Sequence, residues 1–167
     1  MSTRAFRGAG LFVAATLMLA AAGGVVAGAA SKSTPTTALK QGPATQQVTS
    51  AFVTLFNAND KNMAAREKLI QNASHYKTVF VKLFNSKVAK ANPTVAKVTA
   101  VTFPSASECQ AAVKTSACAK VGYDLETATT GAALLTNQTG YAVDVKGHWY
   151  VSDTSFCALA KLGGASC

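Results

Sequence analysis

The segment Gly140–Leu162 constrains the fold most, because it specifies two strands, a tight turn and a helix in succession. Apolar and polar residues alternate in its first part, which is the period of a half-buried strand. Gly147 follows, and glycine accepts the positive φ of a tight turn. A second strand carries Trp149, the only tryptophan of the chain, and a short helix follows that Asp153 or Thr154 can cap. We expect this hairpin to form the centre of the core. The residues of its first strand expected to face inward are Tyr141, Val143 and Val145.

Helical spacing of apolar residues predicts three helices before any strand. Asn62 is the expected N-cap of the second helix. Asn92-Pro93 is expected to end the third, because the residue before a proline avoids the helical conformation. The three predicted ranges are Thr45–Asn57, Met63–Ile70 and His75–Lys90.

Strand signals dominate the rest of the chain. The predicted strands are Lys97–Phe103, Ala119–Ala128 and Gly131–Thr136, and Asn137–Gly140 is the expected turn into the C-terminal hairpin. Helices followed by an antiparallel meander indicate an α+β fold. We therefore predict a curved antiparallel sheet wrapped on three N-terminal helices, with a short C-terminal helix.

The N-terminal residues have the composition of a secretory signal. Arg4 and Arg7 give a positive start, an apolar run follows, and residues 27–29 form a small-residue cleavage pattern. The uncharged run 8–30 is also long enough to span a bilayer, so retention as an anchor is the alternative. We assign residues 1–29 to a signal peptide, 30–44 to a disordered Ser/Thr/Pro/Lys linker and 45–167 to one domain. We expect a secreted or cell-envelope location, with membrane contact only if the signal is uncleaved.

The four cysteines are expected to form two structural disulfides, since the chain carries an export signal. Three pairings are open. We favour Cys109–Cys118, which would close a loop between two strands, and Cys157–Cys167, which would tie the C-terminal tail to the last helix. The chain has no CxxC pair and no paired histidines, so neither a redox site nor a metal site is expected.

The charge is strongly positive, with a formal value of +9 and, without Arg4 and Arg7, of 9 − 2 = +7. The excess is mostly lysine between Lys61 and Lys97. Such a charge favours weak attraction to an anionic envelope component, although a solvated helix face is the simpler interpretation. There is no dense Lys/Arg tract and no aromatic-basic pattern, so we expect no specific nucleic acid binding.

Four short motifs carry a family resemblance. Residues 48–57 read VTSAFVTLFN, 96–103 read AKVTAVTF, 147–152 read GHWYVS and 154–159 read TSFCAL. In this order they resemble the C-terminal domain of the mycobacterial low molecular weight T-cell antigen (Mtb-twelve) family, over about residues 45–162. The resemblance implies a nuclear-transport-factor-2-like (cystatin-like) cone and export by an actinobacterium. It provides no catalytic motif to place on this chain.

We expect a binding or interaction protein without catalytic activity, antigen-like, whose partner the sequence leaves unspecified. A cone fold has an apolar space between sheet and helices. The alternative function is therefore a carrier that binds a hydrophobic small molecule, such as a lipid, in this space. The residues expected either to line this pocket or to fill it as core are Phe80, Phe84, Tyr123 and Trp149.

An isomerase- or dehydratase-like enzyme of the same fold is the less favoured alternative, and it needs an ionisable base in the apolar cavity. The strand pattern places Asp124, Glu126 and Asp144 on the outward side, and His75 and His148 fall at a helix start and in a turn. We therefore expect no catalytic residue and no cofactor. The charged outward face of the sheet favours a monomer or a weak dimer.

Overall fold

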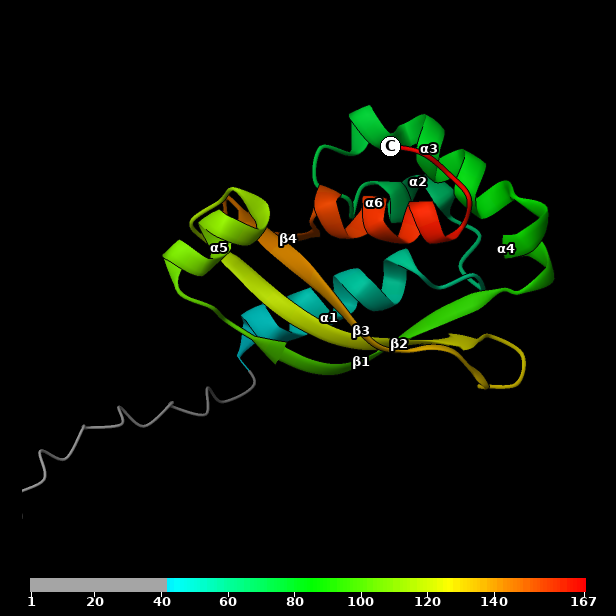
Figure 1. Cartoon of the computed structure of the whole chain (residues 1–167), viewed down its shortest axis with the longest axis horizontal. Helices are drawn as coiled ribbons and strands as arrows, with labels where there is room; N and C mark the ends of the chain where they lie inside the picture. Colours follow the sequence, from blue (N-terminus) through cyan, green and yellow to red (C-terminus); the bar gives the residue numbers. More distant parts are fainter. Residues whose placement is uncertain (1–41) are drawn as a thin grey trace, which may run out of the picture. The chain divides into compact units, whose positions relative to one another are not determined.

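The structure, a computed structural model, describes residues 42–167 (Figure 1). The predicted signal peptide, residues 1–29, lies outside the described residues, and so does the predicted linker up to residue 41. The first described element, α1, spans Pro43–Leu55, so Pro43 and Ala44 lie in its first turn. Within the described part of the chain, no helix is long and apolar enough to cross a bilayer.

In the described part of the sequence, three further helices follow α1 before the first strand: α2 (Met63–Glu67), α3 (Ala73–Asn85) and α4 (Lys87–Ala91). Asn62 caps α2, because its Oδ1 accepts a hydrogen bond from the Ala65 N–H at 3.1 Å. The single helix predicted over His75–Lys90 is wrong, since Ser86 divides it. Ser86 has an extended ψ of 153°, and its Oγ accepts from the Ala89 N–H at 3.0 Å to begin α4.

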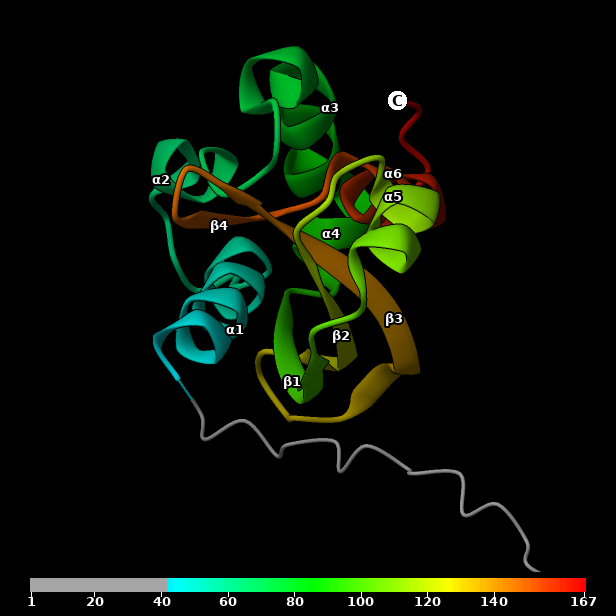
Figure 2. The same cartoon turned by 90° about the vertical axis from the view of Figure 1, so that its left-hand side faces the viewer.

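Within residues 42–167 the sheet has four antiparallel strands in the order β1-β2-β3-β4. α5 (Ala106–Val113) connects β1 to β2, and α6 (Asp153–Leu162) follows β4. Figure 2 shows the sheet curving, with α1 beside its inner side. The predicted α+β class with a curved antiparallel sheet is thereby confirmed. The strands are β1 (Thr94–Thr102), β2 (Cys118–Thr127), β3 (Ala133–Val145) and β4 (His148–Val151).

A single long strand replaces the predicted third strand and its turn. β3 runs without interruption through Asn137–Gly140, so the turn predicted there is wrong. Asn137 has a φ of 55°, and the β2–β3 register shifts around Leu125. The Asn137 N–H donates to the Asp124 carboxylate at 2.7 Å. Asn137 therefore lies at an irregularity in the pairing of β2 with β3. Such an irregularity needs a residue that accepts positive φ, as a turn does, and this explains why the sequence predicted a turn here.

The segment between β1 and β2 is a helix, where the sequence analysis expected a loop. Ser105 and Glu108 form a capping box at the start of α5: the Ser105 Oγ accepts from the Glu108 N–H, and the Glu108 carboxylate accepts from the Ser105 N–H at 2.8 Å. The pKa of Glu108 is lowered, chiefly because the Ser105 hydroxyl donates to its carboxylate at 2.7 Å and further because the Ser105 N–H does. The Ser-x-x-Glu pattern of residues 105–108 is a sequence signal for the start of a helix, and the strand signals on both sides led to the prediction of a loop instead.

The main core lies between α1 and the inner face of the sheet. Phe52 of α1 is fully buried, and its ring centroid lies 5.2 Å from that of Tyr123 on β2. Gly140 of β3 lies against both rings: a Cβ at this position would stand 3.1 Å from Phe52 and 3.2 Å from Tyr123. A side chain is thus excluded at Gly140 by the close approach of two rings.

A second, smaller core lies under α5 on the other face of the sheet. Val143 packs there with the Cys109–Cys118 pair and Val113, and Tyr141 flanks them. The prediction that Tyr141 and Val143 face the main core is therefore wrong: the apolar face that they form is covered by α5, and Ala142 on the opposite face belongs to the main core.

Trp149 is not at the centre of the core, as the sequence analysis expected. It is half-buried on the edge strand β4, where its ring meets that of Phe103 with centroids 5.6 Å apart. The cap of α6 also lies one residue earlier than predicted: the Ser152 Oγ accepts from the Ser155 N–H at 3.2 Å.

The outer edge of β4 is covered by the segment between α2 and α3. The Val151 N–H donates to the Leu69 carbonyl at 2.8 Å, and the Gln71 N–H donates to the Val151 carbonyl at 2.9 Å. Ile70, between them, forms a parallel bridge with Val151 and is 1% exposed. This pairing satisfies edge groups that would otherwise be open to another strand.

The cysteines pair as favoured, Cys109 with Cys118 and Cys157 with Cys167. The first bridge fastens α5 to the start of β2. The second ties the C-terminal residue back to α6, which ends at Gly163 against Leu83.

Substituting Gly140→Ala should lower the free energy of unfolding by about 1–3 kcal/mol, because neither Phe52 nor Tyr123 can withdraw within the core. Urea unfolding measures the effect. Thr139→Ala places the same side chain at the neighbouring exposed position of β3 and should cost about 0.5 kcal/mol or less. Equal losses for the two variants would contradict the close-approach argument.

Alkaline pH should destabilise the fold through Tyr123. Burial raises the pKa of Tyr123 to about 12, whereas an unfolded chain titrates near 10. The folded state therefore holds this proton more tightly, so its contribution is complete below about pH 10 and is lost as pH rises through about 12. Relative to Tyr123→Phe, the wild-type protein should lose about 1.4 kcal/mol per pH unit in that window, measured by urea unfolding. Parallel pH profiles for the two proteins would refute this.

Removing either disulfide should destabilise the protein by about 2–3 kcal/mol, because each closes a short loop in the unfolded chain. The sequence separations are 9 and 10 residues. Cys109→Ser/Cys118→Ser and Cys157→Ser/Cys167→Ser are the variants to compare by urea unfolding. A loss below about 0.5 kcal/mol for either pair would show that its bridge does not constrain the unfolded chain.

Candidate functional site

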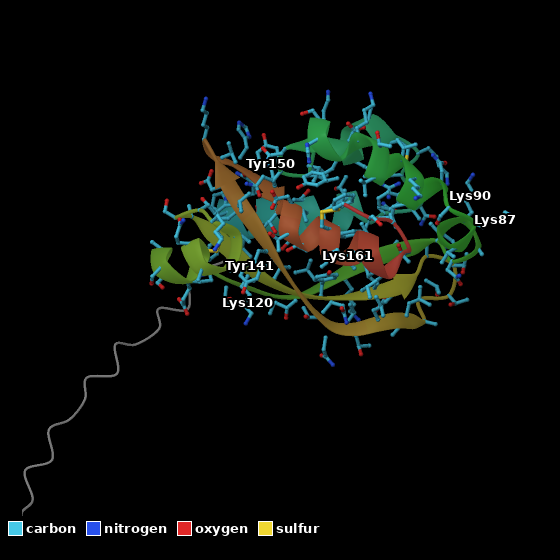
Figure 3. The ribbon with its side chains drawn as sticks, turned by 45° about the horizontal axis from the view of Figure 1, so that its top comes forward. Lys87, Lys90, Lys120, Tyr141, Tyr150 and Lys161 are labelled. Carbon is cyan, nitrogen blue, oxygen red and sulfur yellow. A yellow bond between two sulfur atoms is a disulfide. The ribbon has the colours of Figure 1, made fainter. Side chains whose placement is uncertain are left out.

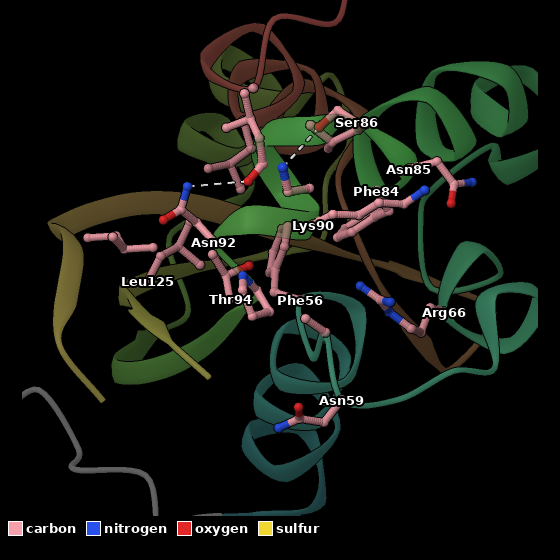
Figure 4. A pocket seen from close by; sticks show the side chains of 18 of the residues that line it. Phe56, Asn59, Arg66, Phe84, Asn85, Ser86, Lys90, Asn92, Thr94 and Leu125 are labelled. Atoms are coloured by element: carbon pink, nitrogen blue, oxygen red, sulfur yellow. Dashed lines mark hydrogen bonds between the residues drawn. The ribbon is translucent and has the colours of Figure 1, made fainter. Parts of the chain in front are cut away.

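A pocket of about 740 Å³ opens where the ends of several elements meet (Figure 4). Its walls come from the end of α1, α2, the α3–α4 break, the start of β1, the paired ends of β2 and β3, and the end of α6. The volume falls in the range of about 300–1,000 Å³ typical of small-molecule sites. The larger apolar residues of the lining are Phe56, Met63, Leu83, Phe84, Val88, Leu125, Leu134, Leu135, Leu159 and Leu162.

The break at Ser86 forms one wall. Leu83 and Phe84 reach the pocket from the last turn of α3, and Val88 and Ala89 reach it from α4. Figure 4 shows Phe84 and Ser86 on this wall, facing Phe56 and Leu125 across the pocket. The change of direction between the two helices therefore belongs to the architecture of the site.

Arg66 of α2 is the one buried charged side chain among the described residues, with 2% of its surface exposed. Its Nε and Nη2 donate to the Leu55 carbonyl at 3.0 and 2.9 Å, and its Nη1 donates to the Asp60 carbonyl at 3.2 Å. The Met63 Sδ lies 3.4 Å from Nη1. A single side chain thus links the end of α1 and the following loop to α2.

The environment of Arg66 combines a helix end with aromatic rings. Leu55 is the last residue of α1, so the guanidinium sits at the negative end of that helix dipole. The guanidinium carbon also lies 4.2 Å from the ring centroid of Phe84 and 5.9 Å from that of Phe80. Burial lowers the pKa of Arg66, and the nearby charge of Asp60 partly offsets this. The group remains a cation at any physiological pH.

Three other charged residues line the pocket: Asp60, Lys61 and Lys90. The lysine side chains are exposed at the rim. The Lys61 Nζ donates to the Ala58 carbonyl at 3.2 Å, and an Asp60 carboxylate oxygen accepts from the Asn62 N–H at 2.8 Å. Together with Arg66, the lining carries three positive charges and one negative charge.

The four residues predicted to share a pocket are separated in the structure. Only Phe84 lines it, with its ring over Arg66. Phe80 and Tyr123 are buried in the main core, at 0% and 2% exposure, and Trp149 lies on β4 beside Phe103. Three of the four therefore act as packing, which is the alternative that the sequence analysis left open.

Arg66 was not among the site residues predicted from the sequence. A usable signal was present, because Arg66 is the only arginine after residue 7 in a chain whose other cations there are lysines. Arginine is preferred over lysine for buried hydrogen-bonded positions, since its planar group presents five donors and is weakly hydrated.

The other titratable residues considered from sequence are not among the residues that line the pocket. His75 and His148 are exposed, and Asp124, Glu126 and Asp144 are half-buried on the strands. Among the described residues, no group of three or more His, Cys, Asp or Glu side chains could hold a metal ion.

Comparisons with known proteins place the chain in a family. The family model "Low molecular weight antigen MTB12, C-terminal domain" matches residues 41–167, which includes every described residue. No curated protein matches the chain. The resemblance carried by the sequence motifs is confirmed, and the chain belongs to the MTB12 low molecular weight antigen family through that C-terminal domain.

Proposed function

We propose that this protein is an exported, non-catalytic binding protein that carries an apolar small molecule in the pocket. The observation that supports it is the lining: leucine, valine, methionine and phenylalanine side chains from six elements, and Phe56 just after α1, surround a volume of about 740 Å³. Small-molecule sites have this composition, with a few polar groups that fix orientation. On this proposal the fold is a cone of the nuclear-transport-factor-2-like type with its wide end open.

The polar residues of the pocket support binding over catalysis. Asp60 is the only carboxylate in the lining, and one of its oxygens already accepts from the Asn62 N–H. Tyr123, the phenol that a cone-fold enzyme could use, packs against the rings of Phe52 and Phe56. An acid–base mechanism needs a group whose pKa is tuned near the working pH and within reach of substrate. Among the described residues, the lining contains no histidine, no tyrosine and no second carboxylate that could act with Asp60 as an acid–base pair.

The distribution of charge supports an envelope location. α3 and α4 carry Lys77, Lys82, Lys87 and Lys90 and no acidic residue. Figure 3 shows Lys87 and Lys90 together at the α4 end of the molecule, away from Lys120 and Tyr141. A cationic end beside the mouth of an apolar pocket suits a protein that works next to anionic lipids or cell-wall polymers.

Blocking the pocket should abolish binding of a neutral apolar probe. Ala89 lines the pocket from α4, so Ala89→Trp should fill it, and the affinity for Nile red should fall by at least about tenfold in a fluorescence titration. Ala91→Trp is the matched control, because Ala91 lies on the same helix, exposed and outside the lining.

Native mass spectrometry of the protein secreted by an actinomycete host tests the natural occupant. A non-covalent adduct that is lost on denaturation, and that is absent from Ala89→Trp, is the expected result. The proposal fails if Nile red binds the wild-type protein no better than Ala89→Trp.

A further inference from the structure

Arg66 brings a buried positive charge to an apolar pocket without a carboxylate partner. All four of its hydrogen-bond contacts are neutral: the Leu55 carbonyl twice, the Asp60 carbonyl and the Met63 sulfur. Within residues 42–167 the one ion pair is Lys97–Glu126, and neither of its residues lines the pocket. A buried charge is costly unless a counter-ion accompanies it. No carboxylate of the described residues makes a hydrogen bond to the guanidinium, and the nearby charge of Asp60 offsets the effect of burial only in part, so an added anion would be favourable here.

The guanidinium also retains donor capacity. Arginine has five N–H groups, and the contacts within the described residues use at most four, which leaves an N–H on Nη2. Arg66 lines the pocket while being 98% buried. Figure 4 shows its nitrogen atoms directed toward Phe84 and the interior of the pocket. An acceptor inside the pocket would therefore meet a donor that water reaches poorly.

Two exposed lysines at the rim of the pocket add to the positive charge of Arg66. Lys61 and Lys90 line the pocket and are exposed, while Asp60 is the single opposing charge and is engaged with the Asn62 N–H. Three cations against one anion leave an excess of two positive charges around a cavity that is otherwise apolar. The complementary molecule has one anionic group and one extended apolar part.

We propose that the pocket binds a long-chain carboxylate, with its head group between Arg66 and the rim lysines Lys61 and Lys90. The acyl chain lies along the apolar wall formed by Leu125, Leu135 and Leu159. This inference rests on the proposed function and names the chemical class of its ligand. A carboxylate on the free Nη2 N–H forms a charge-assisted hydrogen bond, which is stronger than a neutral one.

Dansylaminoundecanoic acid and its methyl ester are the matched probes, since they differ only in the charge of the head group. In a fluorescence titration at low salt the acid should bind at least about tenfold more tightly than the ester. The preference should shrink as salt rises, because the rim lysines are exposed and screened. Unlabelled palmitate should displace the acid.

Two variants locate the head group. Lys61→Gln/Lys90→Gln should reduce the preference for the acid by about threefold or more, and binding of the ester should be unchanged. Arg66→Met should remove most of the preference. Lys77→Gln/Lys120→Gln removes the same charge outside the pocket and should leave the preference as in the wild-type protein.

Each outcome decides between the proposals. Equal binding of acid and ester refutes recognition of a carboxylate and leaves the apolar-carrier proposal standing. Binding of neither probe refutes both. A preference that survives in Lys61→Gln/Lys90→Gln at all salt concentrations refutes the placement of the head group, even if Arg66→Met proves too unstable to measure.

Discussion

The packing of α1 onto the curved sheet is the contact on which the other elements depend. Phe52 is fully buried and meets Tyr123 ring to ring, and both rings fill the space that the absent side chain of Gly140 leaves on β3. This approach fixes how closely the helix and the sheet can lie. A bulkier residue at any of the three positions would displace α1, and with it the end of the helix that Arg66 holds.

Arg66 then fixes the positions of α2 and α3 relative to the end of α1. Its two hydrogen bonds to the Leu55 carbonyl join α2 to the C-terminal end of α1, and its stacking on Phe84 joins α2 to the end of α3. Burying a cation to join three segments costs desolvation free energy, and an apolar side chain of similar size would pack without that cost. A charge at this position is easier to explain if the same guanidinium also binds a ligand.

The pocket opens where several elements of the described residues end close to one another. Ser86 interrupts the helix that would otherwise continue past Phe84, and α4 turns aside. The end of α6, held by the Cys157–Cys167 bridge to the C-terminus, supplies the opposite wall through Leu159 and Leu162. The domain thus combines a packed core around Phe52 and Tyr123 with a separate apolar pocket.

Local patterns in the sequence determined the α+β class, the cap at Asn62, the turn at Gly147 and the family, because each depends on residues close together in the chain or on recognisable motifs. They favoured the cysteine pairing that the structure shows. Only the tertiary structure decided which face of β3 meets the main core, because α5 also covers the opposite face. It also decided that Phe80 and Tyr123 pack while Phe84 lines a pocket. Burial of a particular ring depends on the elements that close over it, and the position of Arg66 depends on contacts 11 residues away in sequence.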